Sequence, residues 1–139
     1  MNILLTGASG LIGTALTSHL ESQGHSVFPL HRNPTSETSH YWFPEEGRIH
    51  LDDEIELDAV IHLAGENIAD ARWSQKKKHR ILNSRVDGTR LLSEALSKLE
   101  HQPGLLISGS AIGYYGDTGD SIVDEDSSRG SGFLSDVAV

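Results

Sequence analysis

The sequence has no cysteine, no long apolar run and few basic residues, and each absence excludes a class of protein. Without cysteine the chain forms neither disulfide bonds nor thiolate metal sites. The absence of disulfide bonds is consistent with a reducing compartment. No apolar run approaches the ~20 residues that cross a bilayer, and the N-terminus lacks the basic region and cleavage site of a secretory signal. The net charge of −9 disfavours general nucleic-acid binding, which needs clustered Lys and Arg. We therefore expect a cytoplasmic protein with neither a membrane nor a nucleic acid as partner.

Metal binding is also not expected. The eight histidines include no pair at metal-ligand spacing on a helix, and His62 lies in an apolar run typical of a hydrogen-bonded core histidine. The acidic run from Asp117 to Asp126 lacks the ligand spacing of a calcium loop. The basic run Lys76–His79 falls in a helical pattern and is interpreted as a solvated helix face.

What the sequence does contain is an alternation of strand and helix patterns. Helical spacing of apolar residues predicts one helix from Leu11 to Gly24 and another from about Ser74 to Glu100. Apolar runs predict buried or partly buried strands at Asn2–Thr6, His25–Leu30, Asp58–Ala64 and Leu105–Ser108, and shorter extended pieces at Tyr41–Phe43 and Arg48–Leu51. This order predicts one domain over residues 1–139 with a doubly wound parallel α/β sheet, since parallel neighbours need crossover connections. Ligands of such sheets bind beyond the carboxyl ends of the strands.

The segment TGASGLIG joins the first strand to the first helix. Gly7 allows the tight turn, Gly10 lets the backbone approach a pyrophosphate, and Gly13 lets the helix lie close to the sheet. We assign six residues of this segment to dinucleotide binding: Gly7, Ser9, Gly10, Leu11, Ile12 and Gly13. The alternative is a glycine-rich turn without a ligand.

Four motifs, TGASGLIG, IHLAGENI, SRVDGTRLLSEAL and SGSAIGYYGDTGD, occur in the order typical of one superfamily. Together they resemble the extended short-chain dehydrogenase/reductase superfamily, and within it the atypical, NAD(P)-dependent epimerase-like branch often described as nucleoside-diphosphate-sugar epimerases. The resemblance implies a Rossmann fold and covers essentially the whole chain. Because family members are much longer, it also implies an N-terminal portion that is incomplete before the substrate-binding part. The segment Ser131–Val139 begins like a helix, with Ser131 as N-cap, and has no stop signal, which fits this expectation.

The end of the second strand bears on the choice of cofactor. NAD-binding members carry an acidic residue there, whereas a nearby Arg accommodates the extra phosphate of NADP. This sequence has His31 and Arg32, which favours NADP over NAD; the alternative is that Arg32 is a solvated loop residue. By the same resemblance, Leu63, Ala64 and Gly65 would pass beneath the adenosine half of the cofactor.

Arg85 stands where typical extended members have an Asn that orders the active site. The resemblance to the atypical branch implies that Arg85 turns toward the cofactor and pairs with phosphate or ribose oxygens. A salt bridge on the helix face is the alternative.

The catalytic residues depart further from the family pattern. The family pairs a Ser or Thr with a Tyr whose phenol is acidified by a Lys four residues on. Ser110 is the candidate for the first role, but Tyr114 and Tyr115 are followed at that spacing by Thr118 and Gly119. Tyr115 is kept as a substitute proton donor, and an aromatic side chain packed beside the crevice is the alternative.

Three functions follow from these observations. The first is an NADP-dependent oxidoreductase or epimerase acting on a carbonyl or sugar-nucleotide-like small molecule, of which this chain supplies the cofactor-binding half. The second is a non-catalytic NADP(H)-binding or redox-sensing module, and the third is an interaction domain that has lost its ligand. The residues do not fix the oligomeric state, and a homodimer is allowed.

Overall fold

The computed structural model describes residues 1–35, 37–52 and 54–139. By their internal contacts the residues form two compact units, Met1–Ser108 and Gly109–Val139, called here the N-terminal and C-terminal units. Each unit is described by itself.

The N-terminal unit is built on a parallel sheet in the order β2-β1-β5-β6. The strands are β1 (Asn2–Thr6), β2 (Ser26–Leu30), β5 (Ala59–His62) and β6 (Leu105–Ser108). From β1 the chain runs to β2 on one side and then returns to β5 on the other, with Ile3 opposite both Val27 and Ala59. The strand order therefore reverses between β1 and β5, and at this point an open α/β sheet forms its ligand crevice.

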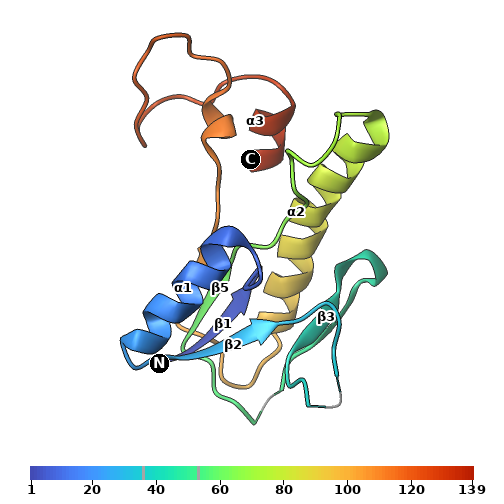
Figure 1. Cartoon of the computed structure of the whole chain (residues 1–139), viewed down its shortest axis with the longest axis vertical. Coiled ribbons are helices and arrows are strands. Elements are labelled where there is room, and N and C mark those ends of the chain that lie inside the picture. The colour runs from blue at the N-terminus through green and yellow to red at the C-terminus, as the bar shows by residue number, and fades with distance from the viewer. Residues whose placement is uncertain (36, 53) are drawn as a thin grey trace. The chain divides into compact units, whose positions relative to one another are not determined.

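Two helices cover opposite faces of this sheet (Figure 1). Helix α1 (Leu11–Ser22) packs Leu16 and Leu20 on the face that carries Ile3 and Leu5. Helix α2 (Gln75–Leu96) packs Leu92 and Leu96 on the other face, against Leu4 and Val60. The alternation of side chains along β1 thus feeds two cores. The expected doubly wound parallel sheet is confirmed.

A small antiparallel hairpin follows β2. It consists of β3 (Tyr41–Phe43), the 3-10 turn η1 (Pro44–Glu46) and β4 (Arg48–His50), so both short extended pieces are strands. Gly47 closes the turn with a φ of 63°, in the left-handed region that favours glycine. Trp42 is buried in the core with Leu92, which anchors the hairpin over α2.

Two expectations for the N-terminal unit need correction. Strand β6 exists, but it is not buried: Leu105, Leu106 and Ile107 are 48%, 44% and 47% exposed. The reason is that β6, at the edge of the sheet, contributes no residue to either of the two core clusters of described residues that α1 and α2 form with the other strands. Helix α2 ends at Leu96, not Glu100, and the next residues form turns.

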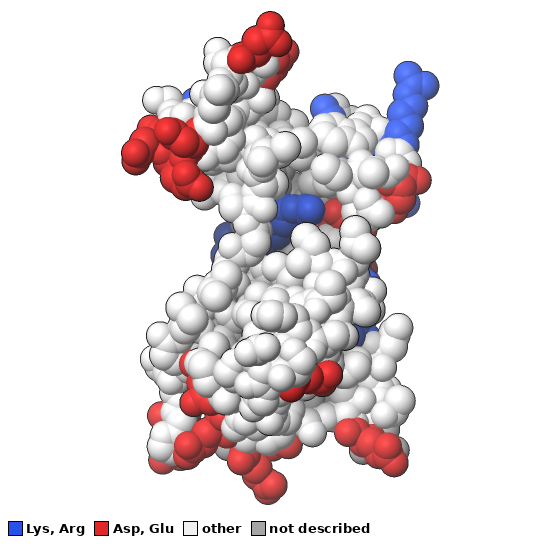
Figure 2. Space-filling model, turned by 60° about the vertical axis from the view of Figure 1, so that its left-hand side comes forward, with Lys and Arg blue, Asp and Glu red and all other residues white. Residues whose placement is uncertain are grey.

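The C-terminal unit contains the 3-10 turn η2 (Ile112–Tyr115) and helix α3 (Phe133–Ala138). Gly132, with a φ of 107°, is the N-cap of α3, so the expectation of Ser131 as N-cap is wrong. Ser135 is buried and lies 2.9 Å from the carbonyl oxygens of Tyr114 and Gly130, which ties α3 to η2. The loop between them carries the acidic run, and Figure 2 shows Asp and Glu side chains gathered on it. Among the described residues, no helix combines the length and the apolar character needed to cross a membrane.

Candidate functional site

Gly7 and Gly13 are required by the fold of the glycine loop. Gly7 has a φ of 72°, and a Cβ on it would lie 2.9 Å from the backbone carbon of Leu63. A Cβ on Gly13 would lie only 2.1 Å from the carbonyl oxygen of Gly7, because α1 begins directly against the loop. These two glycines bring β1, β5 and α1 together at the carboxyl edge of the sheet.

Gly10 has no comparable structural demand. Its φ is −78°, and a Cβ would meet only the Gly7 oxygen, at 3.2 Å. Gly10 is the N-cap of α1, and within the described residues no side chain caps this end, so the first amides of the helix are not occupied by a cap. Leu11 and Ile12 are 92% and 67% exposed, and Ser9 is exposed beside them. The loop therefore presents an open backbone surface with an electropositive helix end.

The carboxyl ends of β1 and β5 are joined by a buried relay. Thr6 Oγ1 accepts hydrogen bonds from the amides of Leu63 and Ala64, at 3.1 and 3.0 Å, so its own hydrogen goes to His62 Nδ1 at 2.6 Å. The neutral ring then carries its proton on Nε2, which donates to Thr89 Oγ1 of α2 at 3.1 Å. Burial lowers the pKa of His62. His62 is thus the hydrogen-bonded core histidine expected from the sequence.

Leu63, Ala64 and Gly65 leave β5 along the crevice edge. Leu63 and Ala64 are half-buried and fixed by their bonds to Thr6, whereas Gly65 is exposed. A Cβ on Gly65 would lie 3.0 Å from the central guanidinium carbon of Arg85. Glycine at this position therefore lets the Arg85 side chain lie against the main chain.

Arg85 binds the loop that follows β5. Its Nη1 donates to the carbonyl oxygen of Glu66 at 3.1 Å and lies 3.3 Å from the carbonyl oxygen of Ile81. Within the described residues Arg85 forms no salt bridge, so the structure does not support the helix-face ion pair considered for it. Burial lowers the pKa of Arg85, and the nearby Glu66 carboxylate opposes this effect.

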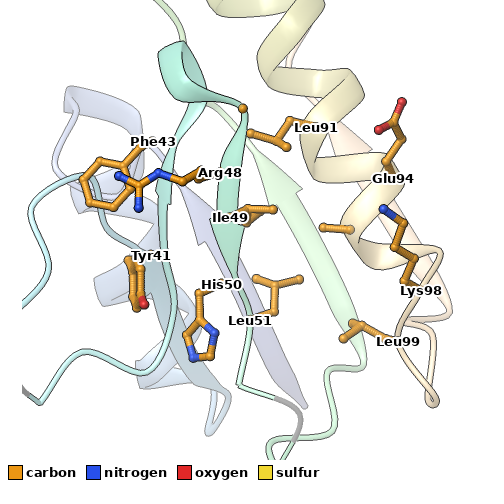
Figure 3. A pocket seen from close by; sticks show the side chains of 12 residues that line it. Tyr41, Phe43, Arg48, Ile49, His50, Leu51, Leu91, Glu94, Lys98 and Leu99 are labelled. Atoms are coloured by element: carbon orange, nitrogen blue, oxygen red, sulfur yellow. The ribbon is translucent and has the colours of Figure 1, made fainter.

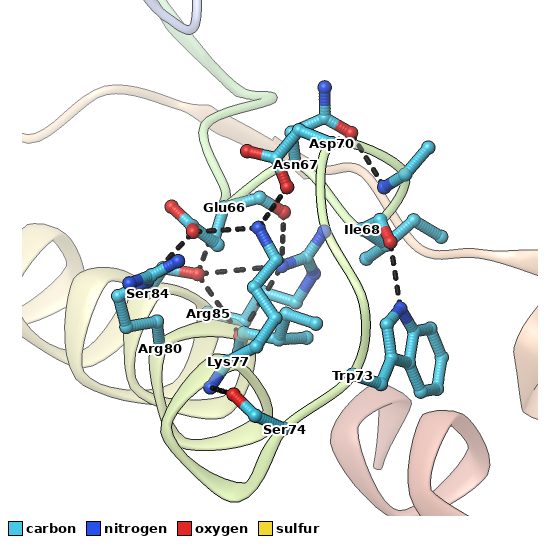
Figure 4. Close-up of polar contacts among 12 residues, drawn as sticks. Glu66, Asn67, Ile68, Asp70, Trp73, Ser74, Lys77, Arg80, Ser84 and Arg85 are labelled. Carbon is cyan, nitrogen blue, oxygen red and sulfur yellow. Dashed lines mark hydrogen bonds and ion pairs between the residues drawn. The ribbon is translucent and has the colours of Figure 1, made fainter.

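A charged cluster that was not predicted from the sequence lies at the same loop (Figure 4). Lys77 is only 1% exposed, its Nζ lies 2.8 Å from Glu66 Oε1, and it also pairs with Asp70. The solvated-face interpretation of the basic run is therefore wrong at Lys77. Lys77 precedes Ile81 by four residues on the inward face of α2, and this spacing was the signal that could have identified it.

The charges in this cluster stabilise one another. Hydrogen bonds from Lys77 lower the pKa of Glu66 and of Asp70, and their two carboxylates raise the pKa of Lys77. Arg80 Nε adds a hydrogen bond to the Glu66 carboxylate at 2.9 Å. The cluster is therefore charged throughout the neutral range of pH.

His31 and Arg32 follow β2. The backbone of His31 is fixed to the hairpin, because its amide donates to the His40 carbonyl at 3.1 Å and its carbonyl accepts from the Trp42 amide at 2.8 Å. Both side chains are exposed, and Arg32 makes no ion pair within the part of the chain that is described. A guanidinium is thus free for an anion after the second strand.

Ser110 and Tyr115 come together in the C-terminal unit. With Ala111, Ile112 and Tyr114 they line an open hollow of about 300 Å³. The rings of Tyr114 and Tyr115 meet edge to face, with centroids 5.2 Å apart. The structure thus groups the two candidate catalytic side chains on one surface of this unit.

A larger groove of about 650 Å³ lies between α2 and the hairpin β3–β4 (Figure 3). Ile49, Leu91 and Leu99 line its apolar part, and none of the residues expected from the sequence to form a site belongs to it. Within the described ranges, no three His, Cys, Asp or Glu side chains gather as a metal site would require.

The reversed strand order, the glycine loop and the two helical layers define a Rossmann-type α/β domain. The chain belongs to the NAD dependent epimerase/dehydratase family, whose model matches residues 3–133. This confirms the family resemblance of the four sequence motifs.

Similar proteins support this assignment. The epimerase family protein Mb2239 of Mycobacterium bovis is 40% identical over 138 residues, which are 99% of this chain and 45% of Mb2239. The crystal structure of human epimerase family protein SDR39U1 (isoform 2) with NADPH is 32% identical, with a TM-score of 0.80, over 99% of this chain and 46% of that one. The nucleoside-diphosphate sugar epimerase of Corynebacterium glutamicum is 34% identical, with a TM-score of 0.77, over 99% of this chain and 28% of that one. The chain thus spans less than half the length of these relatives.

Proposed function

We propose that this chain is the NADP(H)-binding part of an NAD(P)-dependent oxidoreductase or epimerase. The observation that carries the proposal is that the fold does not itself require glycine at position 10. The fold itself explains Gly7 and Gly13, whereas Gly10 keeps the uncapped end of α1 open, as contact with a pyrophosphate would require. The human relative, whose structure contains NADPH, supports the same assignment.

The described residues fit such a cofactor. Gly10 and the first amides of α1 would hold the diphosphate, and the exposed backbone at Gly65 would border the adenosine half. Arg32 would bind the additional phosphate of NADP. When bound, NADPH supplies a hydride to a carbonyl carbon. Ser110 would hold the carbonyl oxygen by a hydrogen bond, with Tyr115 as the substitute proton donor beside it.

Calorimetric titration of the Arg32→Ala variant with NADPH and NADH tests the choice of cofactor. Loss of a charge-assisted hydrogen bond to the phosphate should weaken NADPH binding by roughly 10- to 100-fold, while NADH binding should change little. Arg90→Ala is the matched control, since Arg90 is an exposed arginine on α2 paired with Asp87. Equal losses for both cofactors in Arg32→Ala would remove the role of Arg32 in phosphate recognition.

A carbonyl or sugar nucleotide is the proposed substrate class. The similarity to the Corynebacterium epimerase supports it. The direct test uses a protein that joins this chain to a substrate-binding part. Reduction of carbonyl compounds is followed by the absorbance of NADPH. Epimerisation of sugar nucleotides is followed by chromatography of the products, because an epimerase regenerates its cofactor.

A non-catalytic NADP(H)-binding module is the second candidate. The sequence after Tyr114 and Tyr115 favours it, because neither tyrosine is followed, four residues on, by the lysine that would acidify its phenol. If the protein that joins this chain to a substrate-binding part binds NADPH but neither reduces nor epimerises any panel substrate, the second candidate is favoured over the first.

A further inference from the structure

The loop from Gly65 to Ser74, called here the 65–74 loop, is held by α2 mainly through Glu66. Glu66 uses its amide, carbonyl and carboxylate groups for this purpose. The amide donates to Ser84 Oγ at 2.9 Å and the carbonyl accepts from Arg85 Nη1 at 3.1 Å. The carboxylate accepts from Lys77 Nζ at 2.8 Å and from Arg80 Nε at 2.9 Å.

The four partners of Glu66 lie on one stripe of α2. Lys77, Arg80, Ser84 and Arg85 are spaced as i, i+3, i+7 and i+8, which places them on the same face of a helix. Lys77 extends the hold to the middle of the loop, because it also pairs with Asp70 (Figure 4). Farther along, Trp73 Nε1 donates to the carbonyl oxygen of Ile68 at 2.8 Å. The 65–74 loop is therefore fixed at several points although it contains neither helix nor strand.

The burial of Lys77 distinguishes it from an ordinary surface charge. Because the Lys77 residue is 1% exposed, its ammonium group loses hydration, and two paired carboxylates offset this loss. An apolar residue at this position would avoid the desolvation cost but could not hold Glu66 and Asp70. Lysine at this position therefore provides directed ion pairs to two loop carboxylates in place of apolar packing.

We propose that Lys77 is a positioning residue that keeps the 65–74 loop in the shape of a wall for the dinucleotide crevice. The loop starts at Gly65, directly after the amides of Leu63 and Ala64 that Thr6 fixes at the carboxyl ends of β1 and β5. Lys77 and Asp70 therefore set the course of the main chain that leaves this edge. The inference rests on the proposed function, since the crevice is the one assigned to NADP(H).

The test compares Lys77→Met and Asp70→Asn with Lys76→Met, an exposed neighbour that serves as the matched control. Trypsin cleavage after Arg72, an exposed residue of the 65–74 loop, is followed by mass spectrometry and reports on loop opening. NADPH affinity is measured by calorimetry, and the thermal midpoint reports on the whole fold. Asp70→Glu, which keeps the charge at a half-exposed side chain, is the conservative rescue.

We expect both loop variants to be cleaved after Arg72 at least about fivefold faster and to bind NADPH roughly tenfold more weakly. Lys76→Met and Asp70→Glu should behave like the unmodified chain. If Lys77→Met does not fold, the Asp70→Asn and Asp70→Glu pair decides the question alone. Unchanged cleavage, or NADPH affinity equal to that of Lys76→Met, overturns the inference.

Failure of the proposed function gives a different pattern. If the unmodified chain binds no NADPH, the proposed function falls and the positioning role for that cofactor falls with it. Cleavage after Arg72 would still differ between Lys77→Met and Lys76→Met if Lys77 holds the loop. The two failures are therefore distinguishable in one set of measurements.

Discussion

Gly10 and Gly13 belong to the same motif but meet different surroundings, so alanine should act mainly on cofactor binding at Gly10 and mainly on stability at Gly13. A methyl group on Gly13 would lie 2.1 Å from the Gly7 oxygen, so Gly13→Ala should lower the free energy of unfolding by about 1–3 kcal/mol. Gly10→Ala meets the same oxygen at 3.2 Å and should cost less than about 1 kcal/mol, because a small shift relieves the contact. NADPH binding should nevertheless be weakened strongly by Gly10→Ala, since the methyl group enters the space of the pyrophosphate.

Denaturant unfolding and calorimetric titration of the two variants separate these effects. Gly24→Ala is a useful control, because Gly24 has a φ of 81° but nothing lies within 4 Å of its added Cβ. That variant reports backbone strain without steric contact. If Gly10→Ala binds NADPH as well as the unmodified chain does, Gly10 serves the turn alone, and the observation that carries the proposed function is lost.

At the scale of elements, the Thr6–His62–Thr89 relay makes the junction of β1, β5 and α2 sensitive to pH. Burial lowers the pKa of His62 in the folded chain, so the unfolded chain binds more protons as the pH falls below about 6.5. The free energy of unfolding should therefore decrease on acidification through this window. A protonated ring would also direct an N–H from Nδ1 toward Thr6 Oγ1, which now donates to that nitrogen. Each such histidine contributes a slope of at most about 1.4 kcal/mol per pH unit.

Denaturant unfolding between pH 5 and 7 of the unmodified chain and of His62→Gln measures this slope. The variant should lose part of the slope but not all, because burial also lowers the pKa of His40. Protonation of Glu66 and Asp70 changes the free energy of unfolding only at lower pH, because hydrogen bonds from Lys77 lower their pKa values below the ordinary 4.5 and 3.8. His79→Gln, at an exposed position of α2, is the control. An identical slope in His62→Gln would show that the relay does not report on folding.

The elements themselves could be predicted from the sequence better than their surroundings. Local patterns of apolar residues and glycines are sufficient to locate β1, α1, β5 and α2, because these patterns depend on neighbours along the chain. The burial of Lys77 is not visible in composition, since the three successive lysines differ only in the helix face that each occupies; only the spacing of Lys77 to Ile81 distinguishes it. Similarly, the apolar residues of β6 predict a strand, whereas their exposure depends on which elements pack on its faces. The partner of Arg85 could not be predicted either, because the 65–74 loop has no periodic pattern.

At the scale of the whole molecule, the two edges of the parallel sheet differ in their protection. Strand β2 contains Pro29, which has no amide hydrogen to donate to an added strand. Strand β6 has no such residue, and its aliphatic side chains are 44–48% exposed, which favours pairing with another chain. We therefore predict concentration-dependent self-association of this chain. Ile107→Lys should weaken it by about tenfold or more, as measured by sedimentation velocity over a range of protein concentrations.

Charge alone provides a competing explanation, because an added lysine also alters a chain of net charge −9. Ile122→Lys makes the same change of charge at a residue that is 98% exposed in the C-terminal unit and lies outside every strand. Association through β6 requires that Ile107→Lys suppress the larger species while Ile122→Lys leaves them unchanged. Equal suppression by both variants would assign the association to net charge. A chain that stays monomeric at every concentration would show that the open edge of β6 is too short to recruit a second copy.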